Sequence, residues 1–173
     1  MLRRALLLIA ITLVLIPVRA GAQAWAEYRP AGGGFSLEMP GGWNTEVMNI
    51  DTAIGRVKGY TATVEVGAVG YMSMYIPYPP DAVRGRPVET MLDGARDGAV
   101  ANVHGTLRSE EHVTIDNHPG RQIIIDAPNN MVLVQKFFVL DATLIQAIVG
   151  GHPGIEQDPN TIRFLQSLKV VAP

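Results

Sequence analysis

Apolar and polar residues alternate through several short stretches of the first half of the chain. The stretches are 35–39, 62–68 and 71–76, and a further extended piece is expected from Trp43 to about Asn49. A repeat of two residues places successive side chains on opposite faces of an extended backbone, so this pattern predicts half-buried β-strands. Pro40 follows the first stretch and Pro77 the last, and each is expected to end its strand because proline has no N–H to give to a ladder.

The repeat changes between residues 88 and 103, where apolar residues recur every three or four positions. With Pro87 near its start and Gly105 just beyond its end, this stretch is predicted to be an amphipathic helix. A second helix is expected near the C-terminus. Asp158 is its predicted N-cap and Pro159 lies in its first turn.

Four strands in hairpin order are predicted between the two helices. They cover 107–115, 121–126, 131–140 and 144–149. Residues 123–125 and 131–140 carry apolar side chains on both faces, and a sheet that is apolar on both sides must be covered on both sides. The pattern therefore predicts an α+β fold, an α/β/α sandwich in which helices cover both faces of a central antiparallel sheet.

The first 22 residues have the pattern of an export signal. Arg3 and Arg4 precede an apolar run from Ala5 to Ile16, and the small residues 20–22 suit a signal peptidase that cuts after Ala22. The alternative is a retained anchor, but a membrane span takes roughly 20 apolar residues. We therefore expect one periplasmic or secreted domain, residues 23–173, with no stable membrane span after cleavage.

The composition excludes several kinds of functional site and partner. The chain has no cysteine, which excludes disulfides, thiolate metal sites, cysteine nucleophiles and the lipid-attachment cysteine of a lipoprotein. Loss of the leader removes three of the 14 basic residues and leaves 11 against 16 acidic ones. A negative surface of this kind repels phosphate, so we expect no nucleic-acid partner.

Histidines of the third quarter of the chain are the candidate reactive groups. His112 and His118 lie on or beside one predicted hairpin with Asp126, and two imidazoles and a carboxylate can bind a zinc-type ion. The alternative reading is solvated surface histidines, since no HxxxH or HExxH spacing is present. No serine lies in a GxSxG turn. We therefore expect no catalytic residue, metal or cofactor; a small metal-dependent or hydrolytic enzyme built on this neighbourhood is the alternative function.

Three tyrosines and two arginines form the candidate partner-binding set. They are Tyr71, Tyr75, Tyr78, Arg84 and Arg86. Tyrosine offers a large amphipathic contact area, and the prolines around Tyr78 would fix the loop before binding. The alternative is that Tyr71 and Tyr75 pack beneath a helix. Met72 and Met74 are expected to fill the core rather than to line a ligand pocket.

Several motifs resemble those of the PsbP/Mog1-like group of small exported bacterial proteins. They are GFSLEMPGGW at 34–43, MLDGARDG at 91–98, IDNHPGR at 115–121, KFFVLDATLIQAIVGG at 136–151 and FLQSLKV at 164–170. The resemblance covers nearly all of residues 34–170, and it implies an α/β/α sandwich and an accessory or binding role without catalytic residues. The expected function is an exported, non-catalytic binding or accessory protein of the bacterial envelope, whose partner is another envelope protein or a small ligand.

Overall fold

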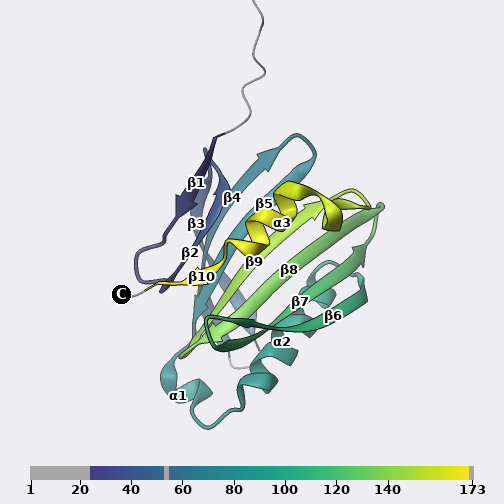
Figure 1. Cartoon of the computed structure of the whole chain (residues 1–173). Coiled ribbons are helices and arrows are strands. Elements are labelled where there is room, and N and C mark those ends of the chain that lie inside the picture. The colour runs from purple at the N-terminus through teal and green to yellow at the C-terminus, as the bar shows by residue number, and fades with distance from the viewer. Residues whose placement is uncertain (1–23, 53–54, 172–173) are drawn as a thin grey trace, which may run out of the picture.

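The computed structural model describes residues 24–52 and 55–171, and this part of the chain is mostly β (Figure 1). The strands are β1 (Trp25–Tyr28), β2 (Phe35–Pro40), β3 (Asn44–Thr52), β4 (Gly55–Val66), β5 (Val69–Pro77), β6 (Thr106–Ile115), β7 (His118–Ala127), β8 (Met131–Leu140), β9 (Thr143–Gly151) and β10 (Lys169–Val170). The helices are α1 (Pro80–Val83), α2 (Val88–Asn102), the 3-10 turn η1 (Ile155–Gln157) and α3 (Pro159–Gln166). The leader, with the cut predicted after Ala22, lies outside the described residues.

Seven strands form one antiparallel sheet in the order β3-β4-β5-β9-β8-β7-β6. Two runs of neighbouring strands, β3 to β5 and β6 to β9, build it, and α1 and α2 lie in the connection between them. The runs join where β5 pairs with β9, from Gly70 opposite Gly150 to Pro77 opposite Thr143. This pairing brings the first half of the domain against its last hairpin.

A second sheet of three strands, in the order β1-β2-β10, lies against one face of the large sheet. Its central strand β2 pairs with β1 near the N-terminal end and with β10 near the C-terminal end of the described chain. Aromatic rings pack between the two sheets: Phe35 of β2 meets Tyr75 of β5 edge-on, and Tyr28 of β1 meets Trp43, which lies just before β3. Aromatic pairs of this geometry add about 0.5–1.5 kcal/mol to the area they bury.

The expected α/β/α sandwich, and with it the α+β class, is wrong. Helix α2 lies on one face of the large sheet, but the other face is covered by the small sheet together with α3, which has only 8 residues (Figure 1). The segments at 25–28 and 169–170 form strands because both find the free edges of β2. A sheet therefore occupies most of the layer where a second helical layer was expected.

The prediction that the large sheet is apolar on both faces is confirmed. On β8, Phe137 belongs to the cluster beneath α2 and Phe138 to the cluster beneath α3 and the small sheet, and both side chains are fully buried. The helix expected over 88–103 is also present as α2. Asp158 caps α3 as predicted, because its carboxylate accepts hydrogen bonds from the backbone N–H of Asn160 and Thr161. No helix of the described ranges is long and apolar enough to cross a membrane.

Candidate functional site

A groove lies beside α2 on its face of the seven-stranded sheet. A helix is about 10 Å wide, whereas seven strands about 4.8 Å apart span far more than that. Helix α2 packs mainly on β7 and β8, so the sheet surface toward β5 and β3 is left without a helix above it. The groove there has a volume of about 840 Å³, within the range of roughly 300–1,000 Å³ that is usual for small-molecule sites.

The middle of the wall that α2 gives to the groove is built from the smallest residues of the helix. Gly94 and Gly98 line the groove with Ala95 and Ala99. A Cβ atom added at either glycine would meet nothing within 4 Å, and neither residue has a positive φ. Glycine inside a helix costs about 1 kcal/mol relative to alanine. Neither a close contact with a neighbouring atom nor a positive φ requires glycine at these two positions. The missing side chains leave open space between the helix and the groove.

The floor and the opposite wall of the groove are apolar and rich in methionine. The floor comes from Met72, Met74 and Ile76 of β5, Leu133 of β8, and Leu144 and Ile148 of β9, and the opposite wall from Met48 and Ile50 of β3. Met72 and Met74, which the sequence predicted to be core residues, are thus part of the groove. Thioether side chains have several rotatable bonds and adapt to irregular shapes, which suits a flexible apolar occupant.

Two buried glutamines interrupt the apolar floor. Gln135 of β8 and Gln146 of β9 are only 2% and 7% exposed. Gln135 Nε2 donates a hydrogen bond to Gln146 Oε1, and Gln146 Nε2 donates to Met74 Sδ at 3.4 Å. Sulfur is a weak acceptor. The hydrogen-bonding groups of the two side-chain amides are therefore only partly satisfied by one another. They place polar atoms midway along the groove.

The rim at the α1 end of the groove carries one cation that forms no ion pair. Arg86 and Asp51 both line the groove. Asp51 pairs with Arg56, whose Nε lies 2.9 Å from a carboxylate oxygen. Arg86 is exposed, and it takes part in none of the ion pairs found within 24–52 and 55–171, whereas Arg84 pairs with Asp81. The rim is thus left with an unneutralised positive charge.

The candidate partner-binding set is divided by the fold. Tyr71 is 4% exposed and its ring meets those of Trp25 and Phe164, so it packs beneath α3. Tyr75, 8% exposed, stacks on Tyr60.

Tyr78 and Arg86 instead line the groove on the opposite face, and burial raises the pKa of the Tyr78 phenol. Arg84 lies outside the groove lining and pairs with Asp81. As one partner-binding set the five residues stay a prediction; the structure brings together only Tyr78 and Arg86.

The candidate metal or hydrolytic residues are not brought together. His112 lies opposite Arg121 in the β6–β7 ladder, on the α2 face, whereas the ring of His118 lies against Phe138 on the other face. Asp126 is at the far end of β7 and pairs with Arg108. Over the described residues, no group of three or more histidine and carboxylate side chains is placed to hold a metal ion.

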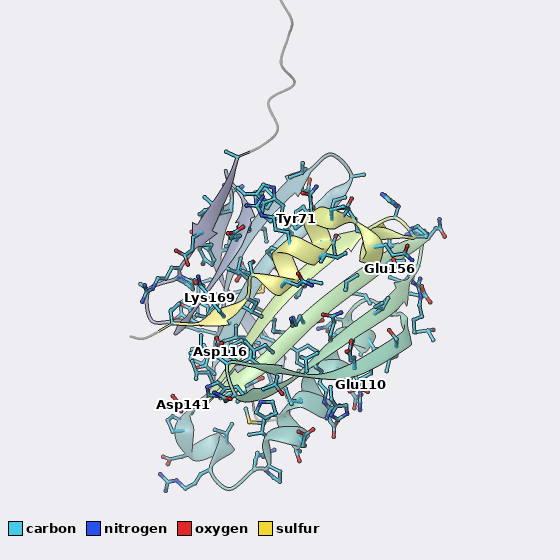
Figure 2. The ribbon with its side chains drawn as sticks, in the orientation of Figure 1. Tyr71, Glu110, Asp116, Asp141, Glu156 and Lys169 are labelled. Carbon is cyan, nitrogen blue, oxygen red and sulfur yellow. The ribbon has the colours of Figure 1, made fainter. Side chains whose placement is uncertain are left out.

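A network of ion pairs fixes α2 to the β6–β7 edge of the sheet, on the side away from the groove. Arg121 of β7 is 4% exposed and pairs with Glu89 and Asp93 of α2 and with Glu110 of β6. Arg96 of α2 also reaches Glu110, at 3.1 Å. Figure 2 shows Glu110 on β6 beside α2. The network holds the helix to one side of the sheet and so leaves the groove uncovered.

The network gives a prediction for stability in acid. Burial by itself raises the pKa of Glu110, but hydrogen bonds from Arg121 and Arg96 and their charges lower it below its ordinary value of 4.5. A carboxyl whose pKa is lower in the folded state stabilises the fold above its unfolded-state pKa, and this contribution is lost as the pH falls through the folded-state value.

Chemical denaturation between about pH 6 and pH 3 should therefore show the free energy of unfolding falling with pH, and falling less steeply in Glu110→Gln. Glu65→Gln is the control, since Glu65 is exposed on β4 and forms no ion pair in the described part of the chain. Equal slopes for wild type and Glu110→Gln would contradict the prediction.

The groove was missed at the level of sequence, although a signal for it was present. Gly94 and Gly98 are four residues apart and so share one face of a helix, and two helix-destabilising residues on one face indicate that something must fit against them. The amphipathic pattern of residues 88–103 showed which side of the helix is buried. It did not show how much of the sheet the helix leaves open.

Comparison with known proteins shows a shared fold. The solution structure of cyanobacterial PsbP (CyanoP) from Synechocystis sp. PCC 6803 has a TM-score of 0.58 and 10% sequence identity, covering 88% of this chain and 96% of that one. A Pseudomonas aeruginosa protein of unknown function, PA94, has a TM-score of 0.42 and 12% identity, covering 77% and 86%. The sequence matches no family model and no curated protein. The likeness to CyanoP shows that the chain has a PsbP-like fold.

Proposed function

We propose that this protein is an exported, non-catalytic binding protein of the bacterial envelope that holds an apolar small molecule in the groove beside α2. The observation that carries the proposal is the open space in front of Gly94 and Gly98. A PsbP-like fold fits an accessory role of this kind. Support for export comes from the leader of the sequence, with its basic start, apolar run and small residues before Gln23.

An empty apolar groove lowers the stability of the protein, and binding of an apolar ligand would offset this loss. Water in contact with the methionine floor is unfavourable by about 25 cal/mol for each Å² of apolar surface. The two helical glycines lower stability further, by about 1 kcal/mol each relative to alanine. Alanine or a larger residue would fit at both positions, because nothing lies within 4 Å. Keeping both costs is expected where the space is used for binding.

The chemistry of the lining favours binding over catalysis. A hydrolase needs a nucleophile within reach of a base. Among the described residues that line the groove, the polar groups are amides, threonine hydroxyls, the Tyr78 phenol, Arg86 and the already paired Asp51, without a histidine. Burial and weak hydrogen bonding of Gln135 and Gln146 suit orientation of a ligand rather than proton transfer.

The proposal is tested with N-phenyl-1-naphthylamine, a neutral apolar dye that fluoresces when it leaves water. We expect the wild-type protein to bind it and Gly98→Leu to bind it about tenfold more weakly, because the new side chain fills the groove. Ala101→Leu is the matched control: it makes a similar change on the same helix at an exposed residue that does not line the groove.

Circular dichroism of both variants checks that α2 is intact. Absence of dye binding by the wild-type protein would overturn the proposal, and so would equal affinities for Gly98→Leu and Ala101→Leu.

A further inference from the structure

We propose that the ligand of the groove is a monoanionic amphiphile, a free carboxylic acid with an unbranched apolar tail, whose carboxylate binds Arg86 and whose tail lies along α2. This inference rests on the proposed function and names the chemical class of the ligand. Three features of the groove carry it: its length, the apolar character of its floor, and the unpaired charge at one end.

The groove is elongated along the helix. Its lining runs on α2 from Thr90, near Arg86, to Asn102 at the far end. Twelve residues of helix correspond to about 18 Å at a rise of 1.5 Å per residue. Apolar side chains of the floor occur along this length, from Ile76 and Leu144 at one end to Leu133 at the other, with Gln135 and Gln146 between them. An elongated, mostly apolar track of this length fits an extended acyl chain better than a compact ring system.

The charge at the rim selects the head group. Arg86 and Asp51 are the charged residues of the described lining. Asp51 is neutralised by Arg56 at 2.9 Å, which leaves Arg86 as the net charge. A guanidinium forms two parallel hydrogen bonds to a carboxylate and pairs with it better than with a neutral hydroxyl. A cationic head group would be repelled at the same place.

The buried glutamines are the competing position for the head group. They lie midway along the floor and already bond to one another, and Gln146 also donates to Met74 Sδ. A carboxylate placed there would lose its water inside an apolar floor without a cation beside it, which is costly. The head group is therefore assigned to Arg86 at the exposed rim, with the tail passing over the glutamines.

The test measures displacement of N-phenyl-1-naphthylamine from the wild-type protein by monomeric decanoate, decan-1-ol and decylamine, which share one tail length. We expect decanoate to displace the dye at a concentration about fivefold lower than decan-1-ol does, since an exposed ion pair is worth up to about 1 kcal/mol. Decylamine should be the weakest competitor. Added salt should reduce the advantage of decanoate, because the pair is exposed to solvent.

Two arginine variants locate the head group. The preference for decanoate should disappear in Arg86→Ala and persist in Arg84→Ala, a matched control two residues away that is exposed and lies outside the groove lining. Dye binding itself should be unchanged in Arg84→Ala, and in Arg86→Ala each competitor is compared at the dye affinity measured for that variant. A third variant, Gln146→Leu, should keep the preference.

The outcomes separate this inference from the proposed function. If the dye binds but the three competitors act alike, or if Arg84→Ala removes the preference as strongly as Arg86→Ala, the ligand class is wrong while groove binding stands. If Gln146→Leu removes the preference and Arg86→Ala does not, the head group lies at the glutamines and the assignment to Arg86 is overturned. Failure of the dye to bind contradicts the proposed function itself.

Discussion

Replacing Arg121 by leucine is expected to lower the free energy of unfolding by about 3 kcal/mol, because the change leaves carboxylates close together without their main cation. Arg121 is the buried centre of the network, bonded to Glu89 and Asp93 of α2 and to Glu110 of β6. Arg96 remains near Glu110 and Asp93 in the variant, but one guanidinium cannot neutralise three carboxylates. Urea denaturation followed by circular dichroism measures the difference.

Arg84→Leu serves as the control for this substitution. Arg84 and its partner Asp81 are 79% and 86% exposed, and an exposed pair contributes about 0–1 kcal/mol. We expect the stability of this variant to stay within 1 kcal/mol of wild type. If Arg121→Leu were as stable as Arg84→Leu, the network would not be what holds α2 to β6 and β7. It would then also not be the reason why α2 leaves the groove uncovered.

Local patterns predicted most of the strands and both longer helices. The alternation in residues 131–140 and the hairpin turns fixed β7 to β9 because each strand pairs with its neighbour in sequence. The cap of α3 followed from Asp158 alone, since its hydrogen bonds are to residues two and three positions on.

The three-stranded sheet could not be predicted in the same way. Strand β1 has four residues and β10 has two, too few for a repeat of two to be recognised. Their pairing with β2 depends on contacts across most of the chain: Lys169 lies opposite Ser36. A side-chain contact adds to it, since Asp116 in the β6–β7 turn accepts a hydrogen bond from the backbone N–H of Val170, and Figure 2 labels this aspartate near β10.

Candidate site residues that are close in sequence lie on opposite faces of the sheet. His112 and His118 are six residues apart, but the β6–β7 turn lies between them and the two strands turn these side chains to opposite faces. Tyr75 and Tyr78 also lie on opposite faces of the sheet, as residues an odd number of positions apart do along an extended backbone. The groove depends on where α2 lies across the sheet, and this position is set by ion pairs between residues up to 32 positions apart.

Replacing Gly120 by alanine is expected to destabilise the protein by about 2–3 kcal/mol, because the new methyl group has no space. Gly120 lies in β7, opposite Val113 of β6 and Phe138 of β8. A Cβ atom there would overlap the backbone oxygen of Phe137 and would lie 2.9 Å from Ile115 Cδ1. A backbone atom inside a seven-stranded sheet cannot move aside as the end of a flexible side chain can, so the β7–β8 ladder must distort.

The matched control is the same substitution at Gly94, where nothing lies within 4 Å of the added Cβ. Gly94→Ala should raise stability by up to about 1 kcal/mol, since alanine is the better helix former. Differential scanning calorimetry should therefore show Tm falling in Gly120→Ala, by about 2–4 °C for each kcal/mol in a domain of this size, and rising in Gly94→Ala. A Gly120→Ala variant that melts with the wild type would mean that β7 and β8 are not paired in this register. An unchanged or lower Tm for Gly94→Ala would mean that the space in front of α2 is already filled, and the groove with it.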